Sequence, residues 1–268
     1  MKVAALQMVS GTDLQANLAA AHALLREAAA GGAELAVLPE YFCLMGHKDT
    51  DKIAVREAYG DGVVQRFLAG AARELNLWVA GGTLPLATTD AQRVRNTHLV
   101  YSPGGDCVAR YDKIHLFKFD NGRERYDESR VIESGQAPVA FDLPSRDGHT
   151  WRVGLSVCYD LRFPELYRAL AADLLLVPSA FTWVTGQAHW ELLLRARAVE
   201  NLACVVAPAQ GGVHDNGRRT WGHSMVVEPW GGVLASRDEG AGVVLAELDA
   251  ARLAQVRMQL PALEHRVL

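Results

Sequence analysis

Cys158 has the sequence surroundings of a catalytic nucleophile. It follows the apolar run at residues 152–157, which predicts a buried strand, and it precedes a helix that Pro164 is expected to open. A side chain at such a strand-to-helix turn stands above the edge of a sheet. The nearby helix N-terminus would favour a thiolate over a thiol and offer backbone N–H groups to an oxyanion. We therefore expect Cys158 to be the reactive thiol.

Two charged residues also come directly after predicted strands. Glu40 follows the apolar run at residues 35–38, and Lys113 follows the strand expected at residues 107–111. The carboxyl ends of strands are where the sites of α/β proteins collect. A carboxylate there could accept the thiol proton, and a lysine could stabilise negative charge on a tetrahedral intermediate. Together with the cysteine, they predict a Glu, Lys and Cys site.

Each of these residues also has a purely structural interpretation. Glu40 could cap a helix or face solvent, and Lys113 could be an ordinary surface lysine. Free cysteines are usually inert core residues, and we assign that role to Cys204 and to Cys107. None of the nine histidines has a local spacing that marks it as the base. The prediction depends on the conjunction of the three residues.

The apolar pattern predicts a layered α/β fold. A strand at residues 3–9 is followed by a helix at residues 14–30, with Asp13 as its N-cap, and the alternation then repeats. Further strands are expected at residues 34–38, 77–80, 96–101, 107–111, 152–157, 174–177, 204–208, 223–228, 232–236 and 243–248, and further helices at 62–75, 164–172, 187–201 and 250–260. The strands at 96–101 and 107–111 flank a turn and predict an antiparallel hairpin.

One long segment carries no clear periodicity. Residues 113–138 are charged and punctuated by glycine, and a structureless stretch of that length in a compact domain is usually functional. We expect it to be a lid over the site.

Composition limits the classes of function. The 268 residues fit one domain, residues 1–268, with enough apolar side chains for a large core. The formal charge of -4 and the absence of a basic run argue against a nucleic-acid partner. No apolar run is long enough to cross a membrane, and the N-terminus resembles a strand more than an export signal, so we expect a cytoplasmic protein. The four cysteines have no CxxC spacing, which favours neither disulfides nor a metal.

Three motifs resemble the signatures of the nitrilase superfamily. They carry Glu40, Lys113 and Cys158 in the order and spacing of that family, which makes a chance match a poor explanation. The motifs are LPEYF at residues 38–42, YDKIHL at 111–116 and SVCYDLRFPE at 156–165, and the resemblance continues at 178–181, 185–191, 195–201 and 222–231. It covers nearly the whole chain.

The resemblance implies a fold, a mechanism and an assembly. The fold would be a four-layer α-β-β-α sandwich, in a homodimer or larger homo-oligomer. Cys158 would attack a carbonyl and form a thioester, which water then hydrolyses. Glu40 would act as base and acid, while Lys113 and the Tyr159 backbone N–H would hold the oxyanion. Glu128, before the glycine at position 135, would have a supporting role, and neither a cofactor nor a metal would be needed.

Within the superfamily, the stretches at residues 185–190, 223–231 and 260–266 most resemble deaminated glutathione amidases, and ω-amidases come next. Both act on amides of 2-oxo acids, so the small-molecule substrate would carry a carboxylate. Arg162, Lys118, Arg125 and Thr185 are candidates to bind it, and each could equally be a surface charge or a helix cap. The charged loop at residues 117–130 departs from the characterised amidases and leaves substrate identity open.

Other functions compete with this one. A nitrile hydrolase would use the same three residues, although the charged loop favours an amide, and N-carbamoyl compounds are a further alternative. A family member acting only as a binding protein would have lost one of the three residues, and all are present here. A papain-like hydrolase would need a Cys, His and Asn or Asp group, which the Glu, Lys and Cys motifs make a poor fit.

Overall fold

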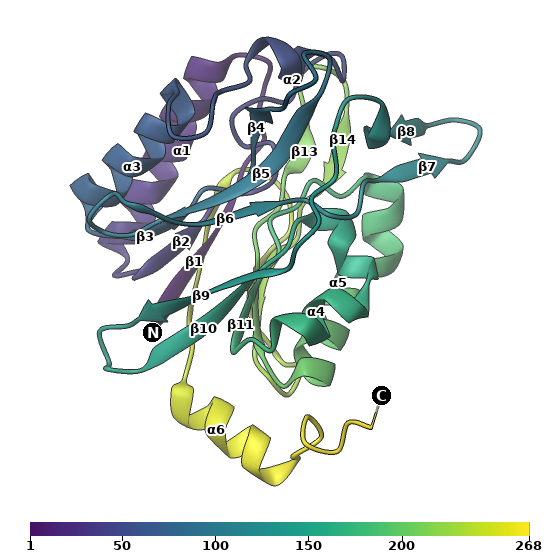
Figure 1. Cartoon of the computed structure of the whole chain (residues 1–268). Helices are drawn as coiled ribbons and strands as arrows, with labels where there is room; N and C mark the ends of the chain where they lie inside the picture. The colour runs from purple at the N-terminus through teal and green to yellow at the C-terminus, as the bar shows by residue number, and fades with distance from the viewer. Residues whose placement is uncertain (268) are drawn as a thin grey trace.

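The computed structural model describes residues 1–267 as two face-to-face β-sheets between two layers of helices (Figure 1). The first sheet contains, in spatial order, β17 (Gly242–Glu247), β1 (Lys2–Gln7), β2 (Leu35–Val37), β3 (Trp78–Ala80), β5 (Val94–Tyr101) and β4 (Leu84–Ala87), with β6 (Cys107–Asp112) also paired to β5. The second contains β16 (Val233–Arg237), β15 (Ser224–Val227), β12 (Cys204–Ala207), β11 (Leu174–Leu176), β10 (Thr150–Leu155) and β9 (Val139–Pro144). The predicted α-β-β-α sandwich is confirmed.

Helices α1 (Leu14–Ala30) and α3 (Val63–Leu75) cover the outer face of the first sheet, at the left of Figure 1. The first of them has the predicted bounds because Asp13 caps it, its Oδ1 accepting a hydrogen bond from the Ala16 N–H at 2.9 Å. Leu18, Leu25 and Ala28 recur at helical spacing and are buried against the sheet.

Helices α4 (Pro164–Leu170) and α5 (Trp183–Asn201) cover the second sheet. Between the sheets, inward-facing side chains of both form one core, in which Trp151, Val153 and Leu155 alternate along β10 and are fully buried. Strands β1, β2 and β3 run parallel to one another, as do β10, β11 and β12, so their carboxyl ends meet at common edges. This places the residues that follow those strands close together.

The segment at residues 113–138 differs from its prediction as a structureless lid. It contains a hairpin of β7 (Lys118–Asp120) and β8 (Arg125–Asp127), and then the 3-10 turn η1 (Glu128–Arg130). The hairpin projects at the upper right of Figure 1. Its strands are three residues long and mostly exposed, and so they leave little apolar periodicity in the sequence.

Other elements were not predicted either. They are α2 (Asp51–Ala54), β4, β9, and the hairpin of β13 (Gly211–Val213) and β14 (Arg219–Trp221). Helix α5 begins at Trp183 and not at residue 187, because Thr182 caps it. The last helix, α6 (Ala250–Gln259), lies at the bottom of Figure 1.

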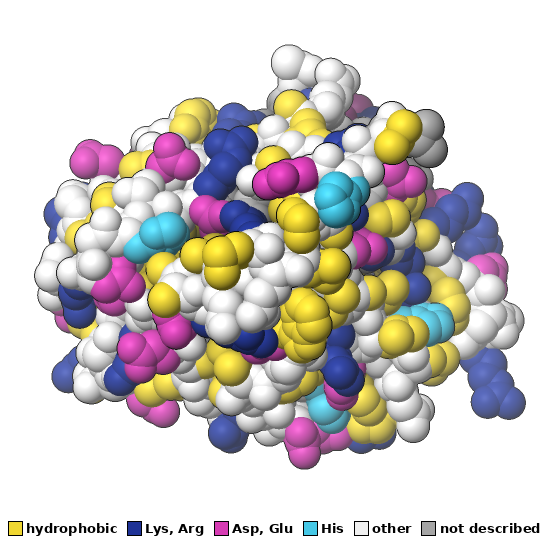
Figure 2. Space-filling model, turned by 90° about the horizontal axis from the view of Figure 1, so that it is seen from below, with side chains coloured by type: hydrophobic (Ala, Val, Ile, Leu, Met, Phe, Trp, Pro, Cys, Tyr) yellow, Lys and Arg dark blue, Asp and Glu magenta, His cyan; other side chains and the backbone are white. Residues whose placement is uncertain are grey.

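Two surface properties bear on possible partners. Within the described part of the chain, none of the helices combines the length and the apolar character needed to cross a bilayer. Seen from below, basic and acidic side chains are interspersed around hydrophobic ones (Figure 2). That face therefore presents no broad field of one sign.

Candidate active site

Glu40 stands at a tight turn that follows β2. The next residue, Tyr41, has the left-handed φ of 56°, and its N–H donates to Thr83 Oγ1 at 2.9 Å. The neighbouring chain comes so close that a Cβ on Gly82 would lie 2.1 Å from the carbonyl oxygen of Pro39. Only glycine fits there, and it also has a positive φ of 52°. The local backbone thus fixes where the Glu40 carboxylate points.

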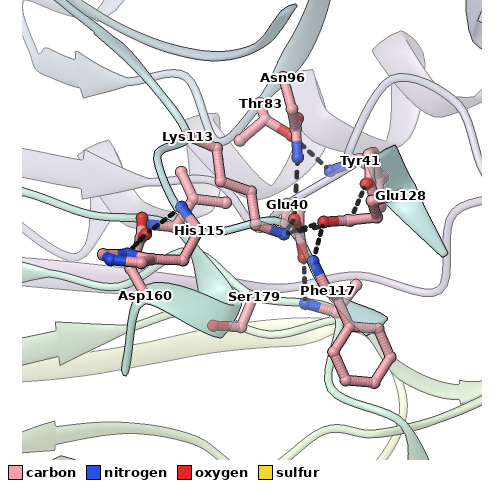
Figure 3. A network of polar contacts seen from close by, with 12 residues as sticks. Glu40, Tyr41, Thr83, Asn96, Lys113, His115, Phe117, Glu128, Asp160 and Ser179 are labelled. Carbon is pink, nitrogen blue, oxygen red and sulfur yellow. Dashed lines mark hydrogen bonds and ion pairs between the residues drawn. The ribbon is translucent and has the colours of Figure 1, made fainter. Parts of the chain in front are cut away.

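Lys113 joins two buried carboxylates (Figure 3). Its Nζ lies 2.9 Å from Oε1 of Glu40 and 2.9 Å from Oε2 of Glu128. The Glu40 carboxylate also accepts hydrogen bonds from Asn96 Nδ2 at 2.9 Å and from the Ala180 N–H at 3.0 Å. Three donors from three different parts of the chain therefore hold one carboxylate in place.

Glu128 is itself held from both sides. The Tyr41 hydroxyl donates to its Oε1 at 2.6 Å and the Phe117 N–H donates to its Oε2 at 2.7 Å. Burial would raise the pKa of Glu128, but Lys113 and these donors outweigh burial and lower it. Burial would likewise lower the pKa of Lys113, but Glu128 and Glu40 raise it above its usual range. Glu128 and Lys113 are therefore both charged at neutral pH.

Cys158 begins the 3-10 turn η2 (Cys158–Arg162) after β10, as the sequence predicts, and its φ is 50°. The expected preference for a thiolate is not found. Burial raises the pKa of the Cys158 thiol well above its usual range, the Glu40 carboxylate raises it further, and Lys113 only partly offsets this. The regular helix α4 begins only at Pro164, so its N-terminus is not at the sulfur. The resting group is a thiol that needs a base.

The Tyr159 N–H is a suitable oxyanion donor. The N–H of Cys158 donates to the carbonyl of Pro178 at 3.0 Å and is therefore occupied. Tyr159 is the second residue of the 3-10 turn, and the first N–H groups of a helical turn have no partner within it. The Tyr159 N–H is therefore available beside the sulfur for a developing negative charge.

Asp160 is a buried residue for which the sequence indicates no role. Its carboxylate accepts hydrogen bonds from the Val157 N–H at 2.8 Å, the Tyr111 hydroxyl at 2.7 Å and the His115 N–H at 3.0 Å. His115 Nδ1 lies a further 2.7 Å from it (Figure 3). Because Tyr111 and His115 flank Lys113, this one side chain ties the lysine segment to the cysteine turn. The only signal in the sequence is an acidic residue two positions after the cysteine.

Glu40, Glu128 and Cys158 line one pocket with about 310 Å³ of empty volume. The rest of its wall is Tyr41, Phe117, Tyr159, Arg162, Ala180, Phe181, Thr182, Thr185 and Arg218. Of the four candidates for carboxylate binding, Arg162 and Thr185 reach the pocket. Lys118 and Arg125 lie on the β7–β8 hairpin with side chains 76% and 79% exposed. Arg218 was missed, because it lies 60 residues beyond the cysteine in an unpredicted hairpin.

Comparisons with known proteins identify the family of the chain. The carbon-nitrogen hydrolase family model matches residues 2–258. The chain belongs to the carbon-nitrogen hydrolase family. It is 41% identical to deaminated glutathione amidase from Synechocystis over 270 residues, which cover 98% of this chain and 97% of the relative.

Solved structures of related hydrolases share the fold. The Caenorhabditis elegans NitFhit protein superposes with a TM-score of 0.88 at 38% identity over 99% of this chain. The chain spans only 64% of that fusion protein. An amidase from Nesterenkonia, solved with an acrylamide adduct on its active-site cysteine, superposes with a TM-score of 0.80 at 28% identity over 97% of this chain and 98% of the amidase.

Membership of this family makes the chain a hydrolase of carbon–nitrogen bonds other than peptide bonds, and specifically a cysteine-dependent amidase of a small molecule. The pocket contains the thiol and the carboxylate that such chemistry requires, and Lys113 lies behind its wall in contact with Glu40. Among the described residues, no group of His, Cys, Asp and Glu side chains is arranged to hold a metal ion.

Proposed function

We propose that the chain hydrolyses deaminated glutathione through a thioester on Cys158. Glu40 takes the thiol proton as Sγ bonds to the amide carbon, and Lys113 and the Tyr159 N–H hold the oxyanion. The intermediate collapses with cleavage of the carbon–nitrogen bond as Glu40 returns the proton to the leaving amine. Water then attacks the thioester, Glu40 accepts its proton, and the thiol re-forms as the acid departs.

The contact of one lysine with two carboxylates beside the thiol carries this proposal. Lys113 lies 2.9 Å from both Glu40 and Glu128, and both carboxylates line the pocket of Cys158. Glu128, held by Tyr41 and Phe117, keeps the ammonium group in place while Glu40 changes its protonation state. We assign Glu128 this supporting role.

The substrate assignment has two supports. The Synechocystis relative is a deaminated glutathione amidase. In addition, the pocket contains Arg162 and Arg218, and their guanidinium groups suit a substrate that carries carboxylates. A ω-amidase activity on 2-oxoglutaramate is the second candidate, because that amide has the same 2-oxo acid part and fits the same chemistry.

A test offers the purified enzyme deaminated glutathione, 2-oxoglutaramate, an N-carbamoyl amino acid and a simple nitrile, and measures cysteinylglycine and ammonia release. We expect a preference for deaminated glutathione. Cys158→Ala should abolish turnover and leave the fold intact, and Glu40→Gln should prevent activation of the thiol. Cys204→Ser is the control, because that buried cysteine lies outside the pocket and should alter stability more than rate. Substantial turnover by Cys158→Ala would move the nucleophile elsewhere.

We also propose that residues 1–268 act as one hydrolase domain in a homodimer in the cytoplasm. Both sheets supply the site, since Glu40 follows β2 and Cys158 follows β10. Helix α5 exposes Val184, Leu192 and Val199, which favours burial against a second copy. The four unpaired cysteines fit a reducing compartment. Sedimentation velocity should give twice the 29.1 kDa chain mass, and a monomer at micromolar concentration would contradict the assembly.

A further inference from the structure

Arg218 is a pocket cation for which the described residues supply no carboxylate partner. Among residues 1–267, none of the ion pairs within 4.0 Å includes it. Its Nε is buried without a hydrogen-bond partner. Its Nη2 is 3.5 Å from the carbonyl of Ala180, at the limit of a hydrogen bond, and its Nη1 is 3.8 Å from Met45 Sδ. This cation is poorly satisfied.

Arg197 shows how a buried arginine is usually satisfied within a protein. Arg197 is buried too, but its guanidinium donates twice to the carbonyl of Leu161 and pairs with Glu200 at 2.7 Å. Taking a guanidinium out of water costs free energy unless donors and charge are matched. A cation that faces a substrate pocket without such partners is suited to a ligand that supplies them.

The backbone around Arg218 is fixed. Its N–H donates to Asn216 Oδ1 at 2.9 Å, and its carbonyl accepts from the His214 N–H at 2.8 Å. Asn216 Nδ2 donates in turn to the carbonyl of Gly46 at 2.8 Å, which ties this turn to the neighbouring loop. The guanidinium carbon lies 5.1 Å from the centre of the Tyr126 ring on β8. The cation is therefore held ready in the pocket wall before a substrate arrives.

The neighbours of Arg218 indicate which end of the substrate it faces. It contacts the carbonyl of Ala180, whose N–H holds Oε2 of Glu40, and it packs on Tyr126, two residues from Glu128. These contacts connect Arg218 to Glu40, the group that in the proposed function returns a proton to the leaving amine.

Arg162 lies among different neighbours. It is in the same 3-10 turn as Cys158, and its guanidinium lies over the rings of Tyr159 and Phe181. Tyr159 directly follows the cysteine and carries the proposed oxyanion donor. The pocket wall thus holds two arginines with different neighbours, which suits a substrate with one carboxylate on each side of its amide.

We propose that Arg218 binds a carboxylate carried by the leaving amine, and that it thereby selects amides of amino acids or short peptides over primary amides. This inference rests on the proposed function and deepens it. A substrate that releases cysteinylglycine presents such a carboxylate, whereas one that releases ammonia does not. A paired, water-poor guanidinium–carboxylate contact is among the stronger polar interactions.

Three substrates with the same 2-oxo acyl group test the proposal. They are deaminated glutathione, its C-terminal carboxamide and 2-oxoglutaramate, and 2-oxoglutarate release gives kcat/KM for each. In Arg218→Gln, the kcat/KM ratio of deaminated glutathione to 2-oxoglutaramate should fall about 30-fold, mostly through KM. The kcat/KM ratio of the carboxamide to 2-oxoglutaramate should not fall in the same variant, because the carboxamide has no carboxylate on its leaving amine. Arg218→Lys should restore part of the ratio, since the charge remains without the fork of donors.

Arg219→Gln is the matched control. That neighbouring arginine is exposed, pairs with Glu239 at 3.1 Å and lies over the ring of Trp183, outside the pocket. It should leave the ratio unchanged. The inference would be overturned if Arg218→Gln left the kcat/KM ratio unchanged or lowered kcat/KM equally on all three substrates. In that case the proposed function would still stand, provided that the wild-type enzyme hydrolyses deaminated glutathione. Wild-type failure on deaminated glutathione would overturn both.

Discussion

Tyr41 and Cys158 share the left-handed backbone conformation, with φ angles of 56° and 50°, at the ends of strands in opposite sheets. Residues other than glycine pay about 1–2 kcal/mol in this region. One of these turns places Glu40 in the pocket and the other places the thiol there. Local backbone strain at both turns is thus coupled to the geometry of the site.

Replacing Cys158 by glycine should separate strain from chemistry. Both Cys158→Gly and Cys158→Ala remove the nucleophile and should be inactive. Because glycine adopts positive φ without a steric cost, Cys158→Gly should be more stable than Cys158→Ala by about 1 kcal/mol. Urea unfolding of the two variants gives this difference. An alanine variant at least as stable as the glycine variant would show that the turn is unstrained.

Asp160→Asn should damage the site without touching the substrate pocket. Asp160 accepts hydrogen bonds from Val157, Tyr111 and His115, and an amide cannot replace both carboxylate oxygens as acceptors. We expect a stability loss of about 2 kcal/mol and a fall in kcat with little change in KM. Asp142, an exposed acid on β9, provides the control Asp142→Asn. A wild-type kcat in Asp160→Asn would exclude a positioning role.

The sequence predicted much of the fold because buried parallel strands and amphipathic helices have strong local patterns. Helix α1 has its predicted bounds, and Glu40, Lys113 and Glu128 meet where the strand-end interpretation and the family resemblance put them. Their catalytic roles are proposals that the variants test. The resemblance added Glu128, because nothing in its local sequence marks it.

The unpredicted features depend on contacts between distant segments. Ala180 holds Glu40 from 140 positions away, and Asn96 does so from 56. The protonation state of Cys158 was wrongly predicted, because burial outweighs the local helix geometry. Arg218 gave no signal in the sequence, since a lone arginine in a polar turn is usually a surface charge.

Tyr41→Phe should shift the pH dependence of the reaction. The pKa of Glu128 is lowered overall. Burial alone would raise it, but Lys113 and the Tyr41 hydroxyl outweigh burial. Loss of the hydroxyl should therefore raise that pKa, so that Glu128 is protonated and releases Lys113 at a higher pH. The acid limb of the kcat profile should move up by about one pH unit, and kcat should fall about tenfold. If the acid limb does not move, the protonation state of Glu128 does not control kcat.

Cys204→Ala should reduce the loss of stability at alkaline pH. Burial, with Glu228 as a further cause, raises the pKa of the Cys204 thiol to about 12, whereas an unfolded thiol titrates near about 8.5. The contribution of this neutral thiol to the free energy of unfolding is therefore fully present below about pH 8.5. It is lost as the pH rises towards the pKa of the folded chain, because in that range only the unfolded chain releases the proton. At pH 10 the loss is about 2 kcal/mol. Urea unfolding at pH 7.5 and at pH 10 measures how much the free energy of unfolding falls between the two pH values. This fall should be smaller by about 2 kcal/mol in Cys204→Ala than in the wild type. An equal fall in both proteins would mean that the thiol titrates normally in the folded chain.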